Sequence, residues 1–133
     1  MRLFASPEMF ERCQNLHILT LQLVIAGGDA THSLIEDVKM CKQIYKARKA
    51  SREKNRFLEL TEQHIYDIND KFIQLSSSVK PDFETLYRFM RAGRITRATN
   101  HMSKMSDELE SLRQDLTTAY ANINQIKESI AKW

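Results

Sequence analysis

The last quarter of the chain carries an uninterrupted heptad repeat, and this repeat limits the possible folds more than any other feature. All ten seam positions between residues 102 and 133 are apolar, and neither proline nor glycine interrupts them. This pattern predicts a long helix that packs along its whole length. Packing within a bundle and coiled-coil self-association use the same pattern, so both remain open. The two seam positions are held by Met102, Leu109, Leu116, Ile123 and Ile130, and by Met105, Leu112, Ala119, Ile126 and Trp133.

A second heptad seam, from Leu58 to Leu75, predicts another helix. We expect this helix to end at the serine triplet 76–78, because Pro81 blocks continuation. A short helix then runs from Pro81 towards Gly93. The seam residues, which are apolar except for Thr61, step by three and four: Leu58, Thr61, Ile65, Ile68, Phe72 and Leu75.

The N-terminal half contains two helical patterns separated by Gly27-Gly28. Two glycines cost roughly 2 kcal/mol relative to two alanines inside a helix, so we expect a break there. A further helix begins near Thr31. Together the segments predict an all-α fold: an up-and-down four-helix bundle with an extra or kinked N-terminal helix. We expect a single domain over residues 1–133, and the end at a seam residue suggests the N-terminal domain of a longer protein.

The sequence lacks the residue clusters that catalysis needs. No phosphate-binding glycine loop is present, and the four histidines are far apart. Cys41 lies on an apolar stripe, where a structural thiol is expected rather than a nucleophile. We therefore expect no enzymatic activity, no cofactor and no metal. Reduced cysteines indicate a cytoplasmic protein, and the apolar run from Leu16 to Ala26 is too short to cross a membrane.

Basic residues are concentrated between Lys39 and Arg56, where eight of them face one acid, Glu53. This stretch is either an ordinary solvated surface or a contact surface for phosphate groups. An anionic membrane attracts such a surface by about 1 kcal/mol per basic residue. Nucleic acid is an unlikely partner, because no base-reading module accompanies the charge. A second cluster contains Arg88, Arg91, Arg94 and Arg97, whereas segments 57–79 and 105–133 lean acidic.

The order of these features from Leu34 to Lys127 resembles the HeLo-type four-helix bundle, as in the N-terminal domain of the mixed-lineage kinase domain-like pseudokinase. The resemblance consists of Val-Lys-Met-Cys-Lys (38–42) before a basic region, a helix ending near Leu75, Phe-Met-Arg-Ala-Gly (89–93), and a long last helix. It implies a domain that oligomerises, binds anionic phospholipid membranes and permeabilises them in immune cell death. It also implies a peripheral position at the inner face of the plasma membrane. The lipid contacts that it implies are Lys39, Lys42, Lys46, Arg48, Lys49 and Arg52.

The alternative function is an adaptor or scaffold bundle without membrane activity, such as a vesicle-tethering or chaperone-like bundle. Its support is the same heptad pattern, which would accept partner helices.

Overall fold

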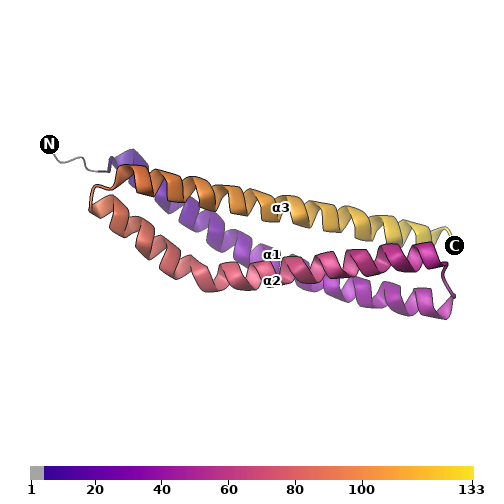
Figure 1. The fold of residues 1–133 in the computed structure, drawn as a ribbon. Coiled ribbons are helices and arrows are strands. Elements are labelled where there is room, and N and C mark those ends of the chain that lie inside the picture. Colours follow the sequence, from indigo (N-terminus) through magenta and orange to yellow (C-terminus); the bar gives the residue numbers. More distant parts are fainter. Residues whose placement is uncertain (1–4) are drawn as a thin grey trace.

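The computed structural model describes residues 5–133, which form three helices in up-and-down order (Figure 1). Helix α1 spans Pro7–Ala47, α2 spans Arg52–Arg91 and α3 spans Ile95–Ala131. With a rise of 1.5 Å per residue, helices of this length make a rod about 60 Å long. The predicted all-α class is confirmed. The predicted four-helix bundle with an extra or kinked N-terminal helix is not, because two expected helix breaks do not occur.

The break predicted at Gly27-Gly28 is wrong, because α1 continues through both residues. Gly27 is buried, and a Cβ atom at this position would overlap the ring of Phe72 on α2. The missing side chain therefore leaves room for an aromatic ring against the α1 backbone. Burying a large aromatic side chain contributes about 1.5–3 kcal/mol, which offsets the helix propensity that the glycines lose.

The end predicted at the serine triplet is also wrong, because α2 runs through residues 76–78 and Pro81. The hydroxyl groups of Ser77 and Ser78 donate to the backbone carbonyls of Ile73 and Leu75. Pro81 lacks an N–H group and crowds the preceding turn, which bends a helix without necessarily ending it. Figure 1 shows α2 curving over this stretch. Buried residues on both sides of the proline, Val79 and Phe83, hold the curved helix against the bundle.

The seam of α3 is covered by α1 and α2 of the same chain. Seven of its ten residues are buried, Leu116 and Ile130 are partly buried, and Trp133 is 44% exposed. The predicted packing of this helix is therefore confirmed over most of its length. The core has two neighbouring clusters, one towards each end of the rod, and both contain residues of all three helices. Self-association through the α3 seam would require the bundle to open.

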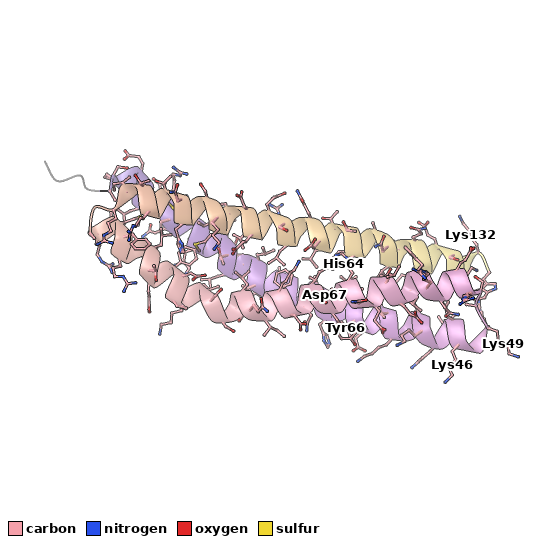
Figure 2. All side chains as sticks on the ribbon, viewed as in Figure 1. Lys46, Lys49, His64, Tyr66, Asp67 and Lys132 are labelled. Atoms are coloured by element: carbon pink, nitrogen blue, oxygen red, sulfur yellow. The ribbon has the colours of Figure 1, made fainter. Side chains whose placement is uncertain are left out.

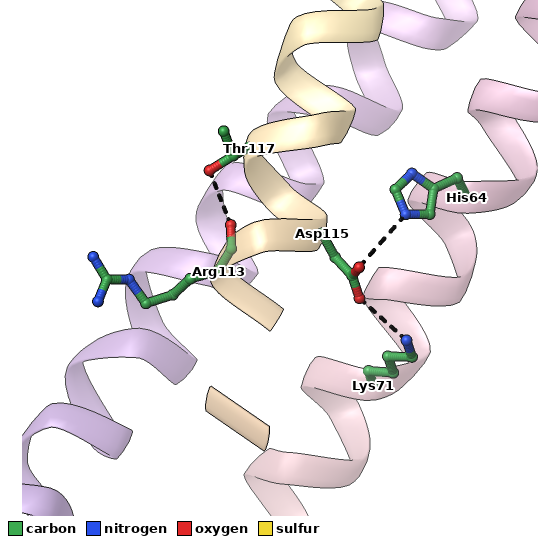
Figure 3. Close-up of polar contacts among 5 residues, drawn as sticks. All are labelled: His64, Lys71, Arg113, Asp115 and Thr117. Carbon is green, nitrogen blue, oxygen red and sulfur yellow. Dashed lines mark hydrogen bonds and ion pairs between the residues drawn. The ribbon is translucent and has the colours of Figure 1, made fainter. Parts of the chain in front are cut away.

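Surface ion pairs connect each pair of helices. Asp115 on α3 lies 3.1 Å from the Lys71 ammonium group and 4.0 Å from the His64 ring on α2 (Figure 3). Exposed pairs of this kind contribute at most about 1 kcal/mol each, so the apolar seams stabilise the bundle more than they do. The other two inter-helix pairs are Lys42–Glu62 at 3.1 Å and Lys127–Asp37 at 2.8 Å.

The two glycines of α1 provide a matched pair of stability predictions. Gly27→Ala should lower the free energy of unfolding by about 2 kcal/mol, because the new methyl group overlaps the Phe72 ring. Gly28→Ala should raise it by up to about 1 kcal/mol, because nothing lies within 4 Å of the added Cβ and alanine favours the helix. Urea denaturation of both variants measures the difference. Equal effects of the two substitutions would contradict the Gly27–Phe72 contact.

Candidate anionic-surface site

The six predicted lipid-contact residues divide into two groups. Lys46, Arg48, Lys49 and Arg52 are exposed around the α1–α2 turn, at one end of the rod. Figure 2 shows Lys46 and Lys49 at this end together with Lys132 of α3.

Lys39 and Lys42 lie further back on the side of α1. Lys39 pairs with Glu36 at 3.4 Å and Lys42 pairs with Glu62 at 3.1 Å. Their charges are therefore partly compensated, and they do not belong to the cluster at the end.

Backbone hydrogen bonds fix the α1–α2 turn, which carries the exposed basic residues. The N–H of Ala50 donates to the Tyr45 carbonyl at 3.0 Å, and the N–H of Lys49 donates to the Lys46 carbonyl at 3.3 Å. This pair of bonds is the Schellman arrangement, in which the residue after the C-cap adopts a left-handed conformation. Lys49 occupies that position with a φ of 50°. Glycine is preferred there, because a side chain in this conformation costs about 1–2 kcal/mol.

Sequence reasoning missed the contribution of α3 to this end. The ammonium group of Lys54 lies 4.1 Å from the centroid of the Trp133 ring, and the guanidinium carbon of Arg48 lies 5.5 Å from it. The ring of Tyr45 meets Trp133 edge-on at 5.7 Å. These contacts attach the end of α3 to the basic turn. With three helices, α3 ends beside the α1–α2 turn, which brings Trp133 to the basic residues. The four-helix arrangement expected from the sequence did not predict this contact.

We name residues 46–56 with Lys132 and Trp133 the basic tip. It contains seven basic residues and one acidic residue, Glu53. A groove of about 460 Å³ beside it, between α1 and α2, is lined by lysines but also by Glu59 and Glu62. The mixed signs in the groove weaken its attraction for an anion. The attraction for phosphate groups is therefore greatest at the exposed tip itself.

The cysteines do not form an activated site in this structure. Cys13 and Cys41 are both buried, and burial raises the pKa of each thiol. A nearby carboxylate, Asp37, raises the pKa of Cys41 further. A raised pKa keeps the thiol protonated at neutral pH, which is the opposite of what a nucleophile needs. Within residues 5–133, no three His, Cys, Asp or Glu side chains gather closely enough to hold a metal ion.

Helix α1 also exposes an apolar ridge formed by Ile18, Leu21 and Ile25. Ile25 is 68% exposed and Ile18 is 52% exposed. Because α1 is continuous, it contains an 18-residue stretch that meets the length and composition of a membrane span, which is longer than the 11-residue run considered in the sequence. A core helix of a water-soluble bundle passes the same test, and α1 packs against both other helices.

Substitution of Lys49 should change stability and membrane binding in opposite directions. Lys49→Gly should raise the free energy of unfolding by about 1 kcal/mol, because it relieves the left-handed backbone. It also removes one charge from the basic tip, so binding to anionic vesicles should weaken. Thermal denaturation and vesicle co-sedimentation measure the two effects. A loss of stability would show that Lys49 has packing contacts that outweigh the backbone strain.

Comparisons with models of known protein families, with curated proteins and with solved structures gave no match. The function proposed below therefore rests on the charges and exposed surfaces of the chain itself.

Proposed function

We propose that this protein is a non-enzymatic helical rod that binds anionic phospholipid membranes through the basic tip. The observation that supports this most strongly is the concentration of seven basic residues and one acid at a single exposed end. These residues come from both sides of the α1–α2 turn and from the end of α3. Such a tip can approach a flat anionic surface without any rearrangement of the bundle. A peripheral position at the inner face of the plasma membrane, in the cytoplasm, is part of this proposal.

The energetics favour the tip over the whole predicted stretch. Each basic residue near an anionic leaflet contributes about 1 kcal/mol, and this attraction acts only within a Debye length of the surface. Lys39 and Lys42 pair with carboxylates, so they contribute less than the residues of the tip. The proposed contact residues are therefore Lys46, Arg48, Lys49 and Arg52 from the sequence prediction, joined by Lys54, Arg56 and Lys132.

Membrane permeabilisation, which the HeLo-type resemblance implies, demands more than binding. An apolar helix must enter the bilayer, and α1 is the helix with suitable composition. However, α1 contributes to both core clusters, including Cys13 in one and Leu34 in the other. Its release would expose the apolar seams of α2 and α3 to water. Binding needs no such opening, so binding is the activity that we propose.

Reversing charges at the basic tip tests the proposal. Lys46→Glu, Lys49→Glu and Arg52→Glu together should weaken co-sedimentation with phosphatidylserine vesicles at least about tenfold, since each basic residue contributes about 1 kcal/mol. A matched control reverses Lys80, Lys104 and Arg113, which changes the net charge equally but lies between the ends of the rod. Circular dichroism checks that both variants remain helical.

Two results would contradict membrane binding through the tip. One is equal binding of the wild-type protein to neutral and anionic vesicles. The other is an equal loss of binding in the tip variant and the control.

A scaffold is the second candidate function, and the apolar ridge of α1 favours it. A second copy fits this ridge, because antiparallel pairing places Ile18 against Ile25 in both directions. The same register brings Glu11 of each copy opposite His32 of the other. Stable interfaces bury about 800 Å² per partner, more than a few side chains on one helix supply. The resulting dimer would therefore be weak and reversible.

Sedimentation velocity over a range of protein concentrations tests the scaffold. A concentration-dependent dimer is expected, and Ile25→Lys should abolish it by placing a charge on the ridge. Ile73→Lys is the matched control, because Ile73 is also an exposed isoleucine, 58% accessible, but lies on α2. A protein that stays monomeric at every concentration would exclude the ridge as a self-association surface.

A further inference from the structure

The end of the rod opposite the basic tip is also positively charged. Arg88 and Arg91 end α2, Arg94 lies in the turn, and Arg97 is in the first turn of α3. All four are exposed, and none takes part in an ion pair found among residues 5–133. No aspartate or glutamate occurs between residues 85 and 106. The proposed function uses none of these arginines.

The α2–α3 turn holds these arginines in the same backbone geometry as the first turn. The N–H of Arg94 donates to the Phe89 carbonyl at 2.9 Å, and the N–H of Gly93 donates to the Met90 carbonyl at 3.1 Å. Gly93 has a φ of 73° at the left-handed position. The arginine backbones are therefore fixed by a closed Schellman turn, which positions their charges at the end of the rod.

Charge alternates along the rod from positive to negative to positive. The start of α1 shares the second end, so we name residues 5–14 and 88–97 the arginine end; it has five basic and two acidic residues. Residues 15–45, 57–87 and 98–131 form the waist, with seven basic and fourteen acidic residues. Each of the three helices contributes at least three of those acids. The waist therefore has a net charge of −7, most of it from α2 and α3, and as a whole it repels an anionic surface.

This distribution determines how the rod meets an anionic membrane. The two ends are about 60 Å apart, several times the Debye length of about 8 Å at physiological salt, so each end interacts separately. A rod lying flat would press the acids of the waist against the lipid. A rod standing on its basic tip avoids that repulsion, and its arginine end then points away from the membrane.

From this geometry we infer that the arginine end is a second site for anionic lipid surfaces, and that one molecule bridges two membranes. The inference rests on the proposed function, because the basic tip must hold the first membrane. Arginine suits the second contact, since its planar guanidinium group forms paired hydrogen bonds with phosphate oxygens.

Vesicle clustering tests the bridge separately from binding. Phosphatidylserine vesicles are mixed with the wild-type protein; co-sedimentation measures binding, and turbidity measures clustering. The arginine-end variant carries Arg91→Glu, Arg94→Glu and Arg97→Glu. It should bind vesicles through the basic tip but cluster them at least about tenfold less than the wild-type protein, as the bridge needs both ends. The control variant with Lys80, Lys104 and Arg113 reversed should cluster vesicles like the wild-type protein.

The arginine-end variant should fold, because glutamates at positions 94 and 97 lie at the start of α3, where they interact favourably with the helix dipole. Arg91→Glu lies in the last turn of α2, where a negative charge is unfavourable, but this costs only about 0.3–1 kcal/mol. If circular dichroism nevertheless shows a loss of helix, Arg94→Gln with Arg97→Gln removes two charges without adding acids. This second variant should also cluster vesicles less than the wild-type protein does.

The outcomes separate the proposed function from the bridge. Absence of wild-type binding to anionic vesicles overturns the proposed function, and the bridge with it. Binding without clustering leaves the proposed function intact and overturns the bridge. Clustering by the arginine-end variant at the wild-type level would show that protein–protein contact joins the vesicles, which also overturns the bridge. Clustering at the wild-type level in the presence of saturating inorganic phosphate would show that the arginines do not hold lipid phosphate groups, which would overturn the bridge as well.

Discussion

The contact between the Phe72 ring and the Gly27 backbone is the interaction on which the long rod depends. It lies midway along α1 and involves a residue of one core cluster, Phe72, at a point where a helix break would divide the molecule. Buried threonines surround it on α1, and the hydroxyls of Thr20 and Thr31 donate to the carbonyls of Leu16 and Gly27 at 2.7 and 2.6 Å. These short, internally satisfied side chains let α2 approach closely. The two helices therefore remain paired along their length, and the ends of the rod stay far apart.

Local periodicity predicted much of the core but not the helix boundaries. The seam of α3 was readable because each apolar position repeats every seven residues within one segment, and Leu109 and Leu112 are indeed buried. The continuity of α1 at Gly27 could not be predicted from the sequence, because it depends on Phe72, which is 45 positions away. The helix end predicted before Pro81 failed for a related reason. Packing of Val79 and Phe83 against the other helices maintains a helix that local propensity would end.

The candidate site shows the same division between local and long-range information. The clustering of Lys46, Arg48, Lys49 and Arg52 was visible in the sequence, because these residues are neighbours in the chain. The position of Lys132 and Trp133 depends on the number of helices. Because α3 runs antiparallel to α2, it ends at the same end of the rod as α1. Both turns of the rod close with the same hydrogen-bond pattern, yet one uses Gly93 at the strained position and the other uses Lys49. Keeping a charged residue there, despite the backbone cost, is consistent with a functional tip.

We propose that the separated positive ends and the acidic waist make the rod stand upright on an anionic membrane. Neutron reflectometry of the protein on a supported phosphatidylserine-containing bilayer measures the thickness of the bound layer directly. A rod standing on one end predicts a layer about 60 Å thick, from the length of its helices. A layer only about 20–25 Å thick, the width expected for three packed helices, would mean that the protein lies flat and would contradict the upright orientation.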